Sequence, residues 1–204
     1  MILLAKFLGV KRRDVAALDL PAGWTCPKAG ICKTRAARDT GRITRFGSVL
    51  CYAAKAEAYL PAARAVRWRN LDQLKGRNVS SMVGLLSSAM PEGVKVIRVH
   101  SSGDFFSLRY FQAWVRFAEE NPNVTFFGYT KILDYAVAPK PDNFYLNYSY
   151  GSMDDERWNI TIPTCFIAEH PDQHPFPVVC GSKEKSHEDY FAILDRKTFV
   201  ISLH

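Results

Sequence analysis

The stretch 94-VKVIRVHSSGDFFSLRYFQAWVRFAEENPNVTFFGYTK-131 decides the fold class. Residues 94–100 are β-branched and largely apolar, a pattern typical of a buried strand. Ser107 is suited to cap a helix that ends near Glu120, and residues 124–131 are expected to form the next strand. One side of that helix carries an apolar stripe, made of Leu108, Phe111, Trp114, Val115 and Ala118. Strand, helix and strand in this order predict two neighbouring parallel strands with a right-handed crossover.

The same pattern extends to both sides of this unit. Further strands are expected at 15–20, 143–149, 159–163 and 198–203. Further helices are expected at 51–60, 61–74, 79–90 and 184–194. These elements predict an α/β fold, a partial parallel (β/α) barrel with an N-terminal cysteine-bearing loop. We expect a single domain over 1–204, made of a cysteine loop with helices (21–90), a βαβ core (94–163) and a C-terminal segment (164–204).

The composition is that of an ordinary globular protein, with 204 residues, 48% of them hydrophobic and 23% charged. No apolar run approaches the roughly 20 residues that span a bilayer. The opening MILLAKFLGVKRR is apolar before it is basic, the reverse order of a secretory signal. We therefore expect a soluble, cytoplasmic protein with no membrane partner. The pattern indicates no particular oligomeric state.

The net charge of +7 favours polyanionic partners. Basic residues are densest between Lys28 and Arg77, for example in 64-RAVRWRN-70. The segment 64–77 therefore predicts either a nucleic-acid surface or a solvated helix face, and charge alone does not decide between them.

Three of the five cysteines, Cys26, Cys32 and Cys51, lie close together in the sequence. An odd number of cysteines in a chain of this length, with no sign of an oxidising compartment, argues against disulfides. The spacing C-x5-C-x18-C fits zinc poorly, because zinc sites pair cysteines two to four residues apart. Three thiolates can hold three irons of a 4Fe–4S cluster, and the helix start at Cys51 favours a thiolate. Unligated core cysteines are the alternative.

Cys165 and Cys180 are separated by fourteen residues, with His170 and His174 between them. Two cysteines and two histidines can form a zinc site, although this spacing matches no standard finger. One of the two cysteines can instead complete the cluster, and both can be plain core residues.

Polar side chains follow the expected strands at their carboxyl ends, where parallel α/β folds bind ligands. These strand exits carry Cys26, His100 to Asp104, Thr130 and Lys131, Ser149 and Cys165. The turn 101-SSGDFF-106 offers backbone N–H groups to an anion, and Asp104 suits an amine. Asp104, Lys131 and His100 are therefore the catalytic candidates. The corresponding structural alternatives are a buried ion pair between Asp104 and Lys131 across adjacent strand tips, a helix cap and a core histidine.

Five blocks of the sequence carry a resemblance to a known family. They are 20-LPAGWTCPKAGIC-32, 51-CYAAKAEA-58, 67-RWRN-70, 100-HSSGDFFSLRYFQAW-114 and 124-VTFFGYTK-131. In this order they resemble the phage family called gene product 88, over about Leu20 to Ser149. The resemblance implies a phage-encoded protein, in the host cytoplasm, whose cysteines hold an iron–sulfur cluster. Members often carry a further cysteine-rich tail, where 180-CGSKEK-185 keeps one cysteine.

The order of the motifs is also similar to that in radical S-adenosylmethionine enzymes. Those enzymes place three cluster cysteines after the first barrel strand and a Gly-rich acidic motif after the second. The three cysteines, Tyr52 and 101-SSGD-104 occupy similar places, although the usual C-x3-C-x2-C spacing is absent. This resemblance implies that S-adenosylmethionine is a second cofactor beside the cluster, held by Ser102, Gly103, Asp104 and Tyr52.

The sequence thus predicts an iron–sulfur protein in which Cys26, Cys32 and Cys51 ligate a 4Fe–4S cluster, with Cys165 or Cys180 as a further ligand. Its expected activity is that of an iron–sulfur oxidoreductase or of an enzyme similar to the radical S-adenosylmethionine class, acting on a small-molecule ligand. The alternative is a non-catalytic nucleic-acid-binding phage protein with a structural iron–sulfur or zinc site.

Overall fold

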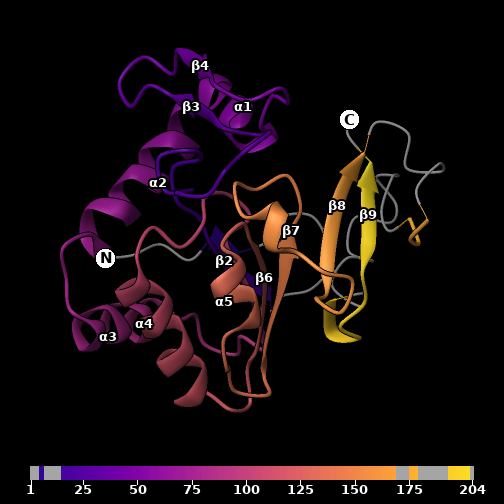
Figure 1. Ribbon diagram of the computed structural model, residues 1–204. Helices are drawn as coiled ribbons and strands as arrows, with labels where there is room; N and C mark the ends of the chain where they lie inside the picture. Colours follow the sequence, from indigo (N-terminus) through magenta and orange to yellow (C-terminus); the bar gives the residue numbers. More distant parts are fainter. Residues whose placement is uncertain (1–4, 7–14, 169–174, 179–192, 203–204) are drawn as a thin grey trace.

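A computed structural model of the chain describes residues 5–6, 15–168, 175–178 and 193–202 (Figure 1). The strands are β1 (Ala5–Lys6), β2 (Val15–Leu18), β3 (Thr34–Ala36), β4 (Ile43–Arg45), β5 (Val96–Val99), β6 (Thr125–Thr130), β7 (Phe144–Ser149), β8 (Thr164–Ala168) and β9 (Phe199–Ser202). The helices are α1 (Tyr52–Tyr59), α2 (Pro61–Leu74), α3 (Val79–Ala89), α4 (Leu108–Glu119), α5 (Leu133–Val137) and the 3-10 helix η1 (Asp155–Arg157).

Within the described ranges, the main sheet has seven strands, in the order β1-β2-β5-β6-β7-β8-β9. From β2 to β9 every neighbouring pair is parallel, and only the short β1 pairs antiparallel, with β2. The fold is therefore mixed α/β with a mostly parallel sheet, which confirms the predicted class. Within the described ranges no pairing joins β9 back to the β1 edge, and the partial barrel stays a prediction.

The predicted βαβ unit is confirmed, because β5, α4 and β6 follow one another and β5 pairs with β6 in parallel. Ser107 is the N-cap of α4, since its hydroxyl accepts a hydrogen bond from the Tyr110 N–H at 3.2 Å. The predicted stripe needs one correction. Leu108 is 55% exposed, whereas Tyr110 and Phe111 on the same first turn of α4 are buried. The buried side chains of α4 are Tyr110, Phe111, Ala113, Trp114, Phe117 and Ala118.

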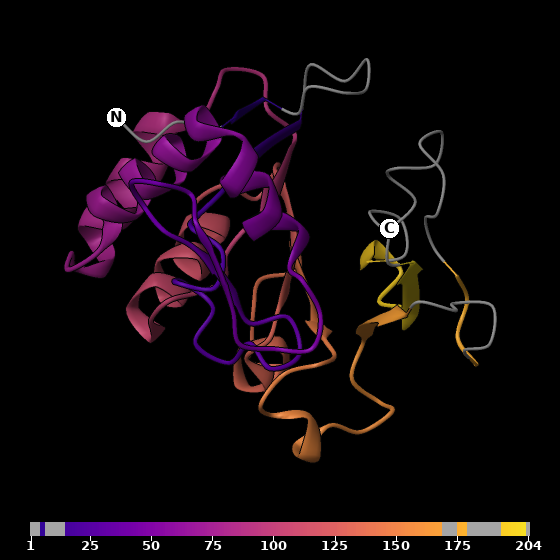
Figure 2. The same ribbon diagram turned by 90° about the horizontal axis from the view of Figure 1, so that it is seen from above.

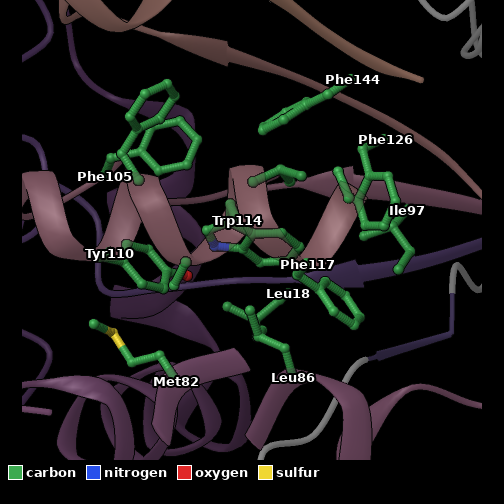
Figure 3. Close-up of a cluster of buried hydrophobic side chains, with 14 of the residues drawn as sticks. Leu18, Met82, Leu86, Ile97, Phe105, Tyr110, Trp114, Phe117, Phe126 and Phe144 are labelled. Carbon is green, nitrogen blue, oxygen red and sulfur yellow. The ribbon is translucent and has the colours of Figure 1, made fainter. Parts of the chain in front are cut away.

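The main hydrophobic core lies between the sheet and helices α2, α3 and α4. Figures 1 and 2 show these helices on one side of the sheet, with β8 and β9 at its far end. Figure 3 shows the core side chains, among them Trp114 and Phe117 from α4, Phe126 from β6 and Leu86 from α3. The burial of so many large apolar side chains is the main force that holds the helices on this face.

The opposite face of the sheet carries a smaller cluster, which includes Val96, Phe127, Cys165 and Phe199. Successive side chains of a strand point to opposite faces, so the neighbours of Val96 and Phe127 in β5 and β6 belong to the main core instead. This second face is not covered by α2, α3 or α4, and it is the face on which the cavity described below lies.

Between β2 and α1 the chain forms a two-stranded antiparallel sheet, β3–β4, which the sequence pattern does not predict. Figure 1 shows β3, β4 and α1 together, beyond one end of the main sheet. This hairpin follows the cysteine-bearing loop directly and returns the chain to Cys51.

The predicted strand at 159–163 is wrong, because this stretch forms a turn and β8 begins at Thr164. The Asn159 side chain accepts hydrogen bonds from the backbone N–H and the hydroxyl of Thr161, a local pattern that competes with strand pairing. The predicted helix at 184–194 lies mostly outside the described residues. No helix in the described part of the chain is long and apolar enough to cross a membrane.

Candidate functional site

The loop between β2 and β3 carries Cys26 and Cys32 and is held by its own backbone. The N–H and hydroxyl of Thr25 both donate to the carbonyl of Pro21, at 3.2 and 2.8 Å. The Gly23 N–H donates to the Cys26 sulfur at 3.4 Å. The sulfur of Cys26 therefore has a fixed place in the loop, with a backbone donor aimed at it.

The same loop is tied to the segment that follows β7. The N–H groups of Gly30 and Ile31 donate to the Gly151 carbonyl at 3.2 and 3.0 Å, and Lys28 forms a 2.9 Å ion pair with the buried Asp154. Gly30 has to be glycine, since a Cβ there would lie 2.7 Å from the Gly151 oxygen. Two strand exits far apart in the sequence are thereby joined.

Cys51 is the N-cap residue of α1, as the predicted helix start requires. Its side chain makes no capping hydrogen bond, and its backbone N–H donates to the Thr34 hydroxyl at 3.2 Å. The thiol is therefore not used to cap the helix and is available for a ligand at the positive end of the helix dipole.

A cavity of about 500 Å³ lies at this end of the sheet, against the face opposite the main core. Its wall includes all four cysteines within the described residues, Cys26, Cys32, Cys51 and Cys165, none of which forms a disulfide. It also includes the other site residues expected from the sequence, His100, Ser102, Gly103, Asp104, Lys131 and Tyr52. The volume is typical of a small-molecule or cofactor pocket.

The cysteine thiols of the loop influence one another electrostatically. Burial raises the pKa of Cys26 well above its ordinary value, with smaller increases from Asp104, Cys51 and Cys32. Burial also raises the pKa of Cys32, against a lowering by Lys131. These two thiols are therefore neutral on their own, and a bound cation would be needed to turn them into thiolates.

Cys165 lines the cavity because of the stagger of β8, which the sequence does not predict. It is the second residue of β8, not a residue beyond a strand end, which corrects the predicted placement. The stagger of the sheet pairs Cys165 with Ser149, the last residue of β7, so the start of β8 is level with the other strand exits. Cys180, His170 and His174 lie outside the described residues.

Asp104 is 3% exposed and joins the exits of β5 and β6. Its Oδ1 accepts from the Phe105 N–H at 2.7 Å and from the Thr130 hydroxyl at 2.8 Å, and its Oδ2 accepts from the Lys131 N–H at 2.8 Å. Burial raises the pKa of Asp104 to about 6, although these hydrogen bonds and Lys131 lower it.

Lys131 reaches away from that carboxylate, toward the end of β7. Its ammonium donates to the carbonyl and hydroxyl of Ser149 at 3.0 and 3.1 Å and to the Tyr150 carbonyl at 2.7 Å. The expected Asp–Lys contact is therefore made by the backbone N–H of Lys131. The ammonium itself fixes the chain where β7 ends.

His100 is buried among aromatic rings at the end of β5. Its Nε2 lies 3.0 Å from the Tyr110 hydroxyl, and its ring contacts Phe105 and Trp114 edge-on. Burial lowers the pKa of His100 to about 3, so the ring is neutral. The backbone of His100 has a positive φ of 66°, which turns the chain sharply into the 101–104 turn.

The 101–104 turn packs against the cysteine-bearing loop. The N–H groups of Ser101 and Ser102 donate to Asp19 Oδ1 at 2.8 and 3.1 Å, so Asp19 occupies the donors that the sequence suggested for an anion. Gly103 has φ 88°, and a Cβ there would lie 2.6 Å from the Thr25 hydroxyl. The hydroxyl of Tyr52 donates to the Ser101 carbonyl.

A buried ionic network supports this turn and was not expected from the sequence. Glu57 of α1 is fully buried, and its Oε1 accepts from the Ala22 N–H and from Arg67, both at 2.9 Å. Ser102 donates to the same oxygen at 3.3 Å, and Arg67 also reaches Asp19 at 3.5 Å. The spacing of residues along α1 and α2 does not predict this network, since its members come from four separate segments of the chain.

The basic segment 64–77 divides into inward and outward side chains. Arg64 is 7% exposed and donates to the backbone carbonyls of Arg38, Glu57 and Asp39. Arg67 belongs to the buried network just described. Only Arg69, Lys75 and Arg77 are exposed basic side chains of this segment.

Among the described residues, no group of three or more His, Cys, Asp or Glu side chains lies close enough to hold a single metal ion. The arrangement therefore differs from a formed zinc site. It brings four thiols to one cavity without gathering them around one point.

Comparison with known proteins gives a consistent assignment. The profile of the family described as Gene product 88 matches residues 5–197. The Gene 88 protein of Mycobacterium phage L5 is 29% identical over 192 residues, covering 83% of this chain and 74% of the relative. That of Mycobacterium phage D29 is 30% identical over 186 residues, covering 80% and 72%. No solved structure gives a significant match. The chain belongs to the gene product 88 family of phage proteins.

Proposed function

We propose that this phage protein is an iron–sulfur protein, in which Cys26, Cys32 and Cys51 hold a 4Fe–4S cluster at the cavity. The observation that supports this most is the shared cavity wall, to which the chain brings four thiols from three separate regions. Chance would spread four cysteines over surface and core. Here they lie together with the strand-exit residues, where parallel α/β folds bind ligands.

The donor set fits a cluster better than one ion. Each thiolate of a cluster binds a different iron, so its ligands stand farther apart than ligands around one zinc. The described thiols are not gathered tightly enough for a single ion. The Gly23 N–H directed at the Cys26 sulfur is the kind of donor that tunes such clusters.

Cys165 is the residue best placed to act beside Cys26, Cys32 and Cys51. It comes from β8, lines the same cavity and is 3% exposed. It can serve as a fourth ligand or leave one iron open to a small molecule. The cluster, when bound, supplies one-electron redox chemistry.

The chain's other cavity residues would bind and orient a ligand there. In the part of the chain that the structure describes, Asp104 Oδ2 accepts one hydrogen bond, from the backbone N–H of Lys131, and a carboxylate oxygen has room for a second donor such as an amino group. S-adenosylmethionine, whose amino acid end carries such a group, is a candidate ligand. Lys131 and His100 would then shape the pocket, Lys131 by holding the end of β7 and His100 as a neutral ring.

Cluster binding is tested by the visible absorption of protein that is purified and reconstituted without oxygen. We expect charge-transfer absorption in the wild type, and its loss in Cys26→Ser, Cys32→Ser and Cys51→Ser. The matched control is Cys165→Ser, which keeps the absorption if Cys26, Cys32 and Cys51 suffice as ligands. Circular dichroism of each variant checks that the fold is intact.

Retained absorption in a loop variant would remove that cysteine from the ligand set. A colourless wild type that binds only zinc would replace the proposal with a structural zinc site. If the cluster forms, titration with S-adenosylmethionine tests the ligand separately, and the absence of any spectral change would exclude it as the iron-bound ligand.

A further inference from the structure

The β3–β4 hairpin concentrates much of the chain's positive charge. Residues 33–46 contain five basic residues and one acidic residue, a net charge of +4 out of +7 for the whole chain. Arg38, Arg42 and Arg45 are exposed, and Lys33 and Arg35 are partly exposed. The segment 64–77 has the same net charge of +4, but two of its five basic side chains, Arg64 and Arg67, are turned inward.

A row of aromatic rings and guanidinium groups runs along the same surface. The Arg35 guanidinium lies 4.6 Å from the ring of Trp24 and 5.4 Å from that of Phe46. The ring centroids of Trp24 and Trp68 are 5.6 Å apart, and the Arg38 guanidinium, which also forms a 2.6 Å ion pair with Asp72, lies 4.9 Å from the Trp68 ring. Three rings and two guanidinium groups therefore follow one another along this surface, in the order Phe46, Arg35, Trp24, Trp68 and Arg38.

Two of these rings are open to solvent. Phe46 is 58% exposed and Trp24 is 46% exposed, although large aromatic side chains are usually buried. Trp24 is also fixed in place, because its indole N–H donates to the Ala36 carbonyl at 2.9 Å. Exposed rings beside exposed positive charge are what proteins use to stack unpaired bases and hold the phosphates between them.

We propose that the hairpin surface formed by Trp24, Lys33, Arg38, Arg42, Arg45 and Phe46 binds single-stranded nucleic acid. Arg42, Arg45 and Lys33 contact phosphates, and Phe46 and Trp24 stack on bases, while Arg38 stays paired with Asp72 beside them. A duplex fits this surface less well, since its bases are already stacked on one another and present only edges. An acidic protein would use the charges but would gain little from the row of rings.

The test is a fluorescence anisotropy titration of the full chain with a labelled single strand of about 16 nucleotides, at several salt concentrations. We expect affinity to fall with salt, with a slope of about −0.7 in log K against log salt for each phosphate contact. The matched duplex is expected to bind about tenfold more weakly at equal salt.

Two pairs of variants with equal loss of charge locate the surface. Arg42→Gln with Arg45→Gln should weaken binding about tenfold or more and reduce the slope by about 1.4, two contacts at about 0.7 each. Lys75→Gln with Arg77→Gln, exposed residues at the end of α2 and just beyond it, should leave both nearly unchanged. Equal losses in the two pairs would mean that only overall charge matters, which would overturn the proposal.

Uncharged substitutions of Phe46 distinguish the contribution of base stacking from that of electrostatic attraction. Phe46→Ala should weaken single-strand binding about tenfold with an unchanged salt slope, and Phe46→Tyr should restore it. Wild-type binding that is equal for single strand and duplex, or unaffected by Phe46→Ala, would contradict stacking. An absence of binding at low salt would contradict the proposal as a whole. All of these outcomes are independent of whether the cavity holds a cluster.

Discussion

Asp104 shows how one residue can have a different role from the one its motif suggests. The sequence placed it at a strand exit as a partner for an amine or for the Lys131 ammonium. In the structure it joins two strand exits by accepting from Phe105, Thr130 and the Lys131 backbone. Its identity and position could be predicted, but its partners could not, because the contacts depend on the register of β5 against β6.

His100 gives a pH prediction. Burial lowers the pKa of His100 to about 3 in the folded protein, from 6.5 for a histidine exposed to water as in the unfolded chain, so folding favours the neutral ring. The stability that this contributes is complete above pH 6.5 and is lost as the pH falls toward 3. Between pH 7.5 and pH 5 the free energy of unfolding should fall by about 2 kcal/mol more in the wild type than in His100→Asn.

Chemical denaturation at the two pH values measures this difference. Asn is chosen because it tolerates the positive φ at this position. An equal pH dependence in the two proteins would show that His100 takes up protons in the folded state as readily as in the unfolded one.

Gly103 gives a packing prediction, with Gly76 as its matched control. Both have positive φ, 88° and 82°, so alanine strains both backbones equally. At Gly76 a Cβ meets nothing within 4 Å, whereas at Gly103 it meets Thr25 and Leu20 below 3.0 Å. Gly103→Ala should therefore cost about 2 kcal/mol more than Gly76→Ala in urea unfolding. Equal costs would show that the 101–104 turn does not pack closely on the cysteine-bearing loop.

Among the helices, α2 is distinguished by the polar side chains it turns inward, Arg64, Arg67 and Asn70. Arg67 compensates Glu57, which is fully buried and whose pKa is raised by that burial. Arg67→Leu should lower the free energy of unfolding by about 3 kcal/mol, since it leaves a buried acid without its partner. Arg69→Leu, two residues on and exposed, should change it by less than about 0.5 kcal/mol. Similar losses in both would mean that the Glu57 carboxyl is neutral and needs no partner.

Most helices and strands were predictable because their patterns are local. The apolar runs at β2, β5, β6 and β7 and the helix starts at Ser107 and Pro61 agree with the structure. The hairpin β3–β4 was missed because its strands are three residues long and rich in Arg and Thr. The strand expected at 159–163 was wrong because Asn159 organises a turn there.

At the scale of the whole molecule, parallel topology explains why the site could be predicted at all. Strand exits meet at one end of a parallel sheet, so residues that follow strands were expected to meet, and they line one cavity. What escaped prediction depends on three-dimensional register. Cys165 reaches the cavity only through the stagger of β8, and Glu57, Arg67 and Asp19 meet only because α1 and α2 fold back over the turn.

A 4Fe–4S cluster at this cavity requires iron and acid-labile sulfide in protein that is purified without oxygen, and chemical analysis measures both. We expect about four irons and four sulfides for each chain, and a large loss of both in the protein that lacks Cys26, Cys32 and Cys51. Zinc without sulfide, or iron that persists when the three cysteines are replaced, would contradict it.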